Sequence, residues 1–435
     1  MWGRFTLLAL LLALVGSVDA QIGKMPSHLI RPASPRDPLF DLETTMASKT
    51  AFWDLRTDKR QVSVSSTPQV VRHGTSYPNK SDMKDIQALL TKLQSFSNVP
   101  SWLKDYKLPY DLSVEEMLSP SGFTDLQSFG MRTRKTLNSA IPMSFSSDKF
   151  VLQHTYKSRT KFSAMAFAST FFDNALDVTY DAHSGASDRL LRFFDECPRY
   201  LRDVFNDDNA VVEMTRFASR NLTDDIETLR AKLNLPVTAY LTASDVQMAY
   251  SACAFGLALN KRRDNWCTLM TEKLVKDVEF GEDLESFCEE SYVNPVNYEI
   301  AAVLLKDIYQ NMKDLIDRKS SVVGNFRFAH GETTMPLLTL LGLVDKTKLT
   351  ADMQPSEVDA RKFRTSRLAL FIANIDFRLY RRKIGSPVAY FVQVRVNEQP
   401  VVVPGCEDSF CDIRTFESIF KTYLTTFNFD NYCTI

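Results

Sequence analysis

The sequence lacks several features that would point to particular classes of protein. Its 52 basic and 53 acidic residues nearly cancel, so no charge excess favours a nucleic acid or an anionic membrane as a partner. No two cysteines have the C-x-x-C spacing and no histidine lies close to a cysteine, which argues against a zinc site. No apolar run is long enough to span a bilayer, and we find no internal repeat. The 44% hydrophobic and 24% charged content is that of an ordinary globular protein.

The N-terminus has the pattern of a secretory signal peptide. Arg4 precedes the apolar run 5–15, and residues 18–20 stand where a signal peptidase reads small side chains. We expect residues 1–20 to be removed before Gln21 and the protein to be exported through the secretory pathway. The last residues, 431–435, match no endoplasmic-reticulum retention signal. The sequence thus predicts a secreted, extracellular protein.

The cysteines and glycosylation sequons suit that compartment. Seven cysteines are present, so at least one is unpaired or pairs between chains, and spacing alone does not fix the connectivity. Asn79 and Asn221 each begin a glycosylation sequon. We expect Asn79 to be unused or to direct its glycan away, because it lies close to the loop described next.

The stretch 69–78 carries the strongest chemical signal. A short β-branched run predicts a buried strand, and Arg72, His73 and Gly74 leave its end in a loop. Ser81 is expected to cap a helix that follows. A strand, a tight loop and a helix direct loop groups toward an anion at the carboxyl end of a sheet. A guanidinium can hold phosphate oxygens and a neutral imidazole can attack phosphorus. The alternative is a chance tripeptide with a structural histidine.

Two further strand-and-loop units follow the same pattern. The run 149–152 predicts a strand that opens into Gln153, His154 and a loop reaching Arg159. The run 325–329 ends in His330, Gly331 and Glu332, and a helix over 333–341 comes directly after. Residues 388–396 and 401–403 predict a closing hairpin. A histidine nucleophile needs a second group to protonate the departing alkoxide, and a carboxylic acid does this well.

Between these units the hydrophobic periodicity of the sequence changes. From about 187 to 318 helical periodicity dominates and strand signals nearly vanish. This block, 187–318, is interpreted as a mainly helical domain or an insertion, which leaves residues 21–186 and 319–435 as the part with strand and helix units.

The motifs together resemble the histidine acid phosphatases, and within them the multiple inositol polyphosphate phosphatases. That family has Arg-His-Gly-Thr-Arg-Tyr-Pro in its first loop, which residues 72–78 match with one departure. It has His-Ala-Glu in its second loop, which residues 330–332 match with glycine for alanine. The residues around Arg159, 366–368, 397–406 and 253–267 extend the similarity over most of the mature chain.

The resemblance implies a fold and a mechanism. The fold is a large α/β domain with a mostly parallel sheet flanked by helices, plus the inserted all-α domain. His73 would form a phosphohistidine, Glu332 would protonate the leaving group, and no metal or other cofactor would take part. The residues expected to bind the substrate's phosphate are Arg72, Thr75, Ser76, Gln153, Arg159 and His330. The resemblance also suggests the disulfides Cys253–Cys267, Cys406–Cys411 and Cys197–Cys433, with Cys288 free.

Two departures from the family pattern bear on activity. Ser76 and Gln153 stand where the family has phosphate-binding arginines, and Arg159 is a more peripheral match. Each lost contact could cost about 1.5–3 kcal/mol, unless Lys157, Lys161 or Arg132 replaces it. The expected function is a phosphomonoesterase of inositol polyphosphates, with bisphosphoglycerate as another candidate substrate. The alternative is a weakly active or inactive protein that binds phosphorylated ligands. The oligomeric state stays open.

Overall fold

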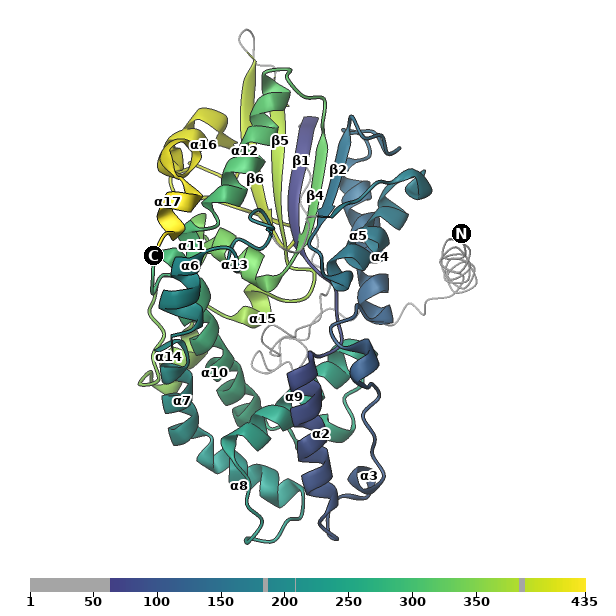
Figure 1. Ribbon diagram of the computed structural model, residues 1–435, viewed down its shortest axis with the longest axis vertical. Helices are drawn as coiled ribbons and strands as arrows, with labels where there is room; N and C mark the ends of the chain where they lie inside the picture. The colour runs from purple at the N-terminus through teal and green to yellow at the C-terminus, as the bar shows by residue number, and fades with distance from the viewer. Residues whose placement is uncertain (1–62, 183–186, 208, 383–387) are drawn as a thin grey trace, which may run out of the picture. The chain divides into compact units, whose positions relative to one another are not determined.

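The computed structural model describes residues 63–182, 187–207, 209–382 and 388–435 (Figure 1). These residues all belong to one compact unit that begins at Asp41. The expected signal peptide, residues 1–20, lies outside the described residues. No helix of the described part is long and apolar enough to cross a membrane.

One mixed sheet of eight strands organises the described chain. The strands are β1 (Ser63–Arg72), β2 (Phe150–His154), β3 (Asp181–Ala182), β4 (Gly324–Ala329), β5 (Asn374–Arg382), β6 (Ala389–Val396), β7 (Gln399–Val401) and β8 (Cys411–Asp412). Their order is β3-β2-β4-β1-β5-β6-β7, and β8 pairs with β6. The pairs among β1 to β4 are parallel, whereas β5 to β8 join antiparallel. The α/β class with a sheet flanked by helices is confirmed. The sheet is mixed where a mostly parallel one was expected, because parallel pairing is confined to β1 to β4.

Strand β1 lies at the centre because both of its faces are apolar where it passes through the core. Val70 and Val71 are both fully buried and face two different hydrophobic clusters. The cluster around Val71 includes Phe129 of α4 (Pro120–Leu137) and Phe167 of α5 (Ser158–Phe171). Helices α12 (Ala302–Ile316) and α13 (Gly331–Leu340) lie on the other side of the sheet (Figure 1). A strand covered on both faces holds its end in a fixed position, which is what a site at that end requires.

The helices run through the whole described chain. The α-helices before residue 200 are α2 (Lys80–Gln94), α3 (Ser101–Lys104), α4 (Pro120–Leu137), α5 (Ser158–Phe171) and α6 (Pro198–Tyr200). Those that follow are α7 (Asn209–Asn221), α8 (Thr223–Lys232), α9 (Ala243–Asn260), α10 (Glu272–Glu290), α11 (Val296–Glu299), α12 (Ala302–Ile316), α13 (Gly331–Leu340), α14 (Pro355–Ala360), α15 (Thr365–Leu368), α16 (Ile413–Ile419) and α17 (Phe429–Cys433). Short 3₁₀ or π turns are η3 (Leu112–Val114), η4 (Ala175–Asp177), η5 (Leu201–Phe205), η6 (Asn265–Leu269) and η7 (Thr422–Thr426).

The described residues of 187–318 form helices and contain no strand. Helix α2, which precedes this segment, packs against α9 within it, and they share one hydrophobic cluster (Figure 1). At the other end, α12 packs against β1 of the sheet. Because packing crosses both ends of the segment, the domain boundaries at 187 and 318 stay a prediction.

Two local predictions were wrong in detail. Helix α2 is capped by Asn79, whose side chain accepts a hydrogen bond from the Asp82 amide at 2.8 Å, and not by Ser81. Ser81 lies inside the helix because Asn79 already satisfies the first amides. The closing hairpin pairs β6 with β7 at Gln399–Val401, two residues earlier than predicted. Asn397 and Glu398 form its turn with positive φ values of 48° and 65°.

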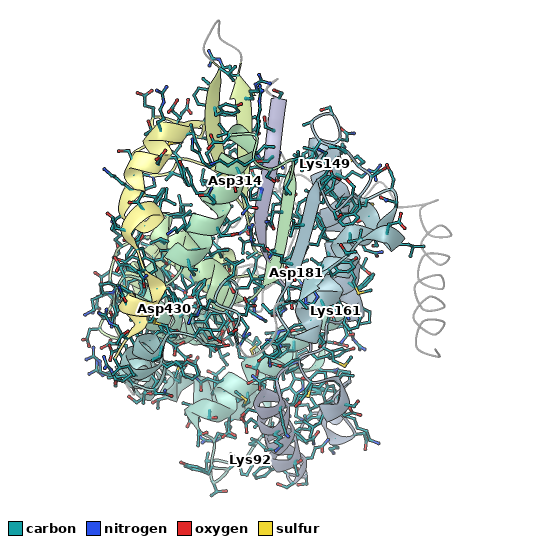
Figure 2. The ribbon with its side chains drawn as sticks, turned by 45° about the horizontal axis from the view of Figure 1, so that its top comes forward. Lys92, Lys149, Lys161, Asp181, Asp314 and Asp430 are labelled. Carbon is teal, nitrogen blue, oxygen red and sulfur yellow. A yellow bond between two sulfur atoms is a disulfide. The ribbon has the colours of Figure 1, made fainter. Side chains whose placement is uncertain are left out.

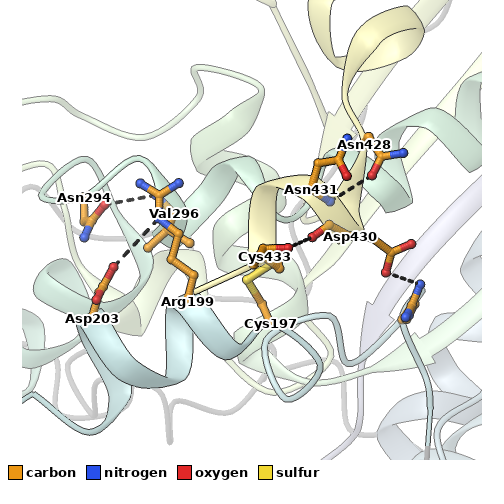
Figure 3. Close-up of a disulfide and its surroundings, with 11 residues drawn as sticks. Cys197, Arg199, Asp203, Asn294, Val296, Asn428, Asp430, Asn431 and Cys433 are labelled. Carbon is orange, nitrogen blue, oxygen red and sulfur yellow. Dashed lines mark hydrogen bonds and ion pairs between the residues drawn. A yellow bond between two sulfur atoms is a disulfide. The ribbon is translucent and has the colours of Figure 1, made fainter.

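The disulfide prediction is confirmed. Cys253 pairs with Cys267, Cys406 with Cys411, and Cys197 with Cys433. Figure 3 shows the last of these, which ties Cys433 at the end of α17 to Cys197 just before α6. Cys288, partly buried on α10, is the free cysteine among the described residues.

Candidate active site

The site lies where the parallel strands β1, β2 and β4 end. Arg72 is paired with Ala329 in the register of β1 and β4, so the residues that follow these strands leave the sheet side by side. His73 and His330 are both buried, with 5% and 1% of their surface exposed, and their ring centroids are 5.6 Å apart. Two histidines 257 positions apart by residue number thus meet at one edge of the sheet.

Close packing explains the glycine after His73. A Cβ atom on Gly74 would lie 2.7 Å from Leu126 Cδ1 and 2.8 Å from the Gly122 carbonyl oxygen. A Cβ on Gly122 would lie 2.3 Å from the Thr75 carbonyl oxygen, so the first turn of α4 also touches the loop through a glycine. Ser119, the N-cap of α4, donates to the same Thr75 oxygen from its amide and its hydroxyl. The first turn of α4 therefore holds the loop that carries His73 in place through close packing and hydrogen bonds.

The hydrogen bonds of His73 identify its tautomer. Nδ1 lies 2.9 Å from the Gly74 carbonyl oxygen, which can only accept, so Nδ1 carries the proton. Nε2 then presents its lone pair, and Arg159 donates to it from Nε at 3.1 Å. Burial, followed by the charges of Arg159 and Arg72, holds the pKa of His73 well below its usual value. The imidazole is neutral, as an attacking nitrogen must be.

Arg72 is held by the loop that precedes β5. Its amide donates to Ala373, its NH1 group donates to the Ala369 carbonyl, and its guanidinium carbon lies 4.7 Å from the Phe371 ring centroid. Burial lowers the pKa of Arg72 to about 10, opposed by the charges of Glu332 and Glu290, so the group stays charged near neutral pH. Ile372 in the same loop has a φ of 63° and donates from its amide to the His73 carbonyl. A β-branched residue in that conformation is strained, as is common beside functional sites.

His330 begins α13 and contacts a pair of threonines. Its Nε2 lies 2.9 Å from Thr155 Oγ1, which lies 2.9 Å from Thr160 Oγ1. Burial, the nearby His73 and the charge of Arg159 hold the pKa of His330 well below its usual value. A neutral imidazole at the N-terminus of a helix can contact a phosphate oxygen without carrying a charge of its own.

Glu332 lies in the first turn of α13, and its side chain is exposed. Its charge acts on Arg72 and on Glu290, the last residue of α10. Burial, followed by the charges of Glu332 and Glu289, holds the pKa of Glu290 well above its usual value. Glu332 is thus placed beside His330 at the same edge of the sheet, and its role as proton donor stays a prediction.

The remaining predicted residues are placed as follows. Thr75 is fully buried, and its hydroxyl has no hydrogen-bond partner among the described residues. Ser76 is buried, with its backbone bridged to Leu118. Gln153, near the end of β2, directs its side-chain nitrogen toward Asp181 on β3 at 3.5 Å. Arg159, a peripheral match to the family motif, donates to His73, and its role in binding phosphate stays a prediction.

Of the cations considered as replacements, Lys157 shares a carboxylate with Arg159, the arginine that contacts His73. Its Nζ is 3.0 Å from Glu116 Oε2, and Arg159 NH1 is 2.9 Å from the same oxygen. Lys161 is exposed on α5 (Figure 2). Arg132 on α4 forms a bidentate pair with Glu398, at 2.7 Å for the shorter contact.

Three residues near the site were missed from the sequence. Glu116 contacts Arg159, Glu290 acts on Arg72, and the charge of Arg192 acts on His330. Arg192 is held by Asp195 and lies over the rings of Tyr156 and Phe194. Each stands in a segment without a motif, so only the tertiary structure brings it to the site.

Comparison with known proteins identifies the family. The model of the "Histidine phosphatase superfamily (branch 2)" matches residues 67–397, which is most of the chain and includes both histidine loops. The chain therefore belongs to this superfamily.

Individual relatives narrow the resemblance. The multiple inositol polyphosphate phosphatase 1 of Gallus gallus is 27% identical, over 84% of this chain and 83% of its own length. The human protein of the same name is 24% identical, over 90% of this chain and 89% of its own length. The expected resemblance to that branch is confirmed.

Solved structures agree on the fold. The phytase from D. castellii superimposes with a TM-score of 0.76 at 17% identity, covering 90% of this chain and 87% of that one. The Bifidobacterium longum multiple inositol polyphosphate phosphatase, in complex with inositol hexasulfate, gives 0.64 at 15% identity, covering 88% and 98%. At these identities the likeness establishes the shared fold.

Proposed function

We propose that this protein is a histidine acid phosphatase that hydrolyses phosphomonoesters of inositol polyphosphates. The observation that carries the proposal is the contact between Arg159 and His73 Nε2, beside His330 and Arg72. This arrangement offers a neutral nucleophile whose Nε2 lone pair accepts from Arg159, a cation that can turn to the oxygens of an incoming phosphate. The names of the relatives supply the substrate class.

The proposed reaction has two steps. In the first, His73 Nε2 attacks phosphorus and forms a phosphohistidine, while Arg72 and Arg159 hold the phosphate oxygens. Glu332 gives its proton to the departing alkoxide oxygen, so the alcohol leaves neutral. In the second, water attacks the phosphohistidine, Glu332 takes back a proton, and inorganic phosphate and neutral His73 are restored.

Release of inorganic phosphate from inositol hexakisphosphate, measured at acidic and neutral pH, tests the proposal. We expect turnover by the native chain and none by His73→Ala, with circular dichroism showing that the variant is folded. Phosphate release by His73→Ala at the native rate would refute the assignment of the nucleophile.

A second candidate is a binding protein that has lost turnover, favoured by Ser76 and Gln153 in place of arginines. Stabilisation by inositol hexakisphosphate in a thermal melt, without phosphate release from any phosphomonoester, would support this alternative.

We also propose that the protein is exported. N-terminal sequencing of the protein from the medium of expressing cells should begin at Gln21. Retention inside the cell with Met1 intact would contradict it.

A further inference from the structure

A carboxylate lies among the cations beside the candidate nucleophile. Glu116 Oε2 accepts from Arg159 NH1 at 2.9 Å and from Lys157 Nζ at 3.0 Å. The same Arg159 guanidinium donates from Nε to His73 Nε2. One planar group therefore joins the nucleophile to Glu116, which places the carboxylate within a guanidinium's width of the reacting nitrogen.

The backbone of the histidine loop fixes the position of Glu116. Its amide donates to the Pro78 carbonyl at 3.0 Å, and the Tyr77 amide donates to Met117 at 2.9 Å. Glu116 has a φ of 56°, in the left-handed region that residues other than glycine adopt at a cost in free energy. Such a conformation persists where the surroundings enforce it, so the side chain is held against the cations by the loop that carries His73 and Ser76.

The charges explain what this carboxylate does to an incoming anion. Partial burial raises the pKa of Glu116, but the charges of Arg159 and Lys157 outweigh it and hold the pKa below its usual value. Among the other charged groups of the site, Arg72 acts on His73 and Arg192 on His330, whereas Glu332 on α13 acts on Arg72. A phosphate at His73 Nε2 must take Arg159 as its partner, and Arg159 is already shared with an anion. Ser76 and Gln153 replace family arginines, so Arg159 and Lys157 are the cations that matter most here.

We propose that Glu116 is a specificity residue that competes with substrate phosphate for Arg159 and Lys157. The inference rests on the proposed function and names the substrate class it favours. A substrate with a second phosphate displaces the carboxylate, because that phosphate takes over Lys157 while the reacting phosphate takes Arg159. An ester with a single phosphate leaves Lys157 and Glu116 paired and meets the repulsion of the carboxylate. The site therefore selects polyphosphorylated alcohols over simple phosphomonoesters.

Binding of inorganic phosphate, measured by titration calorimetry, tests the competition without any need for turnover. Glu116→Gln should bind phosphate about three- to fivefold more tightly than the native chain, the size of effect expected for partly exposed charges. Glu116→Asn removes the same charge with a residue that tolerates the left-handed backbone, and should behave alike. The matched control is Glu115→Gln, which removes one charge from the adjacent exposed residue and should leave the affinity unchanged.

Turnover tests the selectivity. The ratio of kcat/KM for inositol hexakisphosphate to that for p-nitrophenyl phosphate should fall about three- to fivefold in Glu116→Gln, because the single-phosphate ester gains more. Equal or weaker phosphate binding by Glu116→Gln and Glu116→Asn, or no phosphate binding by any of these proteins, would overturn the inference. Tighter phosphate binding by the Glu116 variants, with no turnover by any form, would refute the proposed phosphatase function but support the competition by Glu116. Turnover by the native chain, with the same phosphate affinity in the Glu116 variants, would support the phosphatase function and refute the competition by Glu116.

Discussion

Arg159 Nε lies 3.1 Å from His73 Nε2, so an arginine that matches the family motif only peripherally donates to the candidate nucleophile itself. The guanidinium does two things there. Its charge helps to keep His73 neutral. Its planar guanidinium can also donate to the phosphate oxygens during both attack and release.

Replacing Arg159 should therefore cost more than replacing any lysine nearby. Arg159→Gln is expected to lower kcat/KM for inositol hexakisphosphate by about 10- to 150-fold, the loss of one charge-assisted contact of about 1.5–3 kcal/mol. Arg159→Lys keeps the charge but lacks the planar guanidinium, so its kcat/KM should lie between those of the native enzyme and Arg159→Gln. Lys135→Gln, an exposed position on α4, serves as the control for charge. An Arg159→Gln enzyme as fast as the native one would show that the contact has no part in turnover.

Gly331 offers a test of the packing around Arg72. A Cβ there would lie 3.8 Å from Arg72 Nε and 3.9 Å from its guanidinium carbon, which is ordinary contact. Gly331→Ala should raise the free energy of unfolding by about 0.4–1 kcal/mol, because alanine loses less backbone freedom on folding. Urea denaturation measures this. Gly74→Ala, where the added atom would clash at 2.7 Å, should instead destabilise the protein. Similar effects of the two substitutions would contradict the close packing of the histidine loop.

Glu289 gives a stability effect that depends on pH. Burial, together with the charges of Glu285 and Glu332, raises the pKa of Glu289 to about 7. The unfolded chain titrates this group near its ordinary value of about 4.3, so the folded state binds the proton more tightly. Its contribution to stability is fully present below that value and is lost as pH rises toward 7. Glu289→Gln should leave stability unchanged at pH 4 and raise it by about 1–2 kcal/mol at pH 8. A gain of equal size at both pH values would refute the titration.

The disulfides should differ in what they contribute. Cys197–Cys433 spans 236 residues and Cys406–Cys411 spans 5. In the chain-entropy account the longer loop stabilises the folded state by roughly 3 kcal/mol more. The double variant Cys197→Ser/Cys433→Ser should therefore melt at a lower temperature than Cys406→Ser/Cys411→Ser. The opposite order would mean that the disulfide closing the loop 406–411 contributes more to stability than the one that joins α17 to the residue before α6.

The sequence was most informative where chemistry is local. The loops at His73 and His330 are short motifs at strand ends, and the pairing of β1 with β4 confirms that the two ends are neighbours. Strand β5 was missed although Ile375, Phe377 and Leu379 alternate with the charged Asp376 and Arg378, which is the pattern of a strand. Arg378 donates to Asp376 at 2.6 Å, and Asp376 also accepts from Thr67 of β1 at 2.7 Å. Alternation predicts that such charged residues face solvent, so the sequence does not reveal that Asp376 and Arg378 are both buried.

The other omissions depend on contacts between distant segments. Glu116 lies 43 residues before Arg159 and carries no motif, so its ion pair follows only from the path of the chain around the histidine loop. The side-chain nitrogen of Gln153, whose role in binding phosphate stays a prediction, lies 3.5 Å from Asp181 of a two-residue strand that periodicity cannot detect. Alternation along β2 says that a side chain leaves one face of the sheet, but not which neighbour it meets there.

The central place of β1 also has a consequence for how the protein is made. This strand is among the first elements of the described chain to leave the ribosome, yet its partners are β4, which begins at Gly324, and β5, which begins at Asn374. At 5–20 residues per second, roughly 10–50 s separate the synthesis of β1 from that of β4. Through that interval a strand that is buried in the folded protein has both edges unpaired, which exposes the nascent chain to aggregation. The nucleophile therefore reaches its place only late in synthesis, and the yield of active protein depends on keeping β1 covered until then.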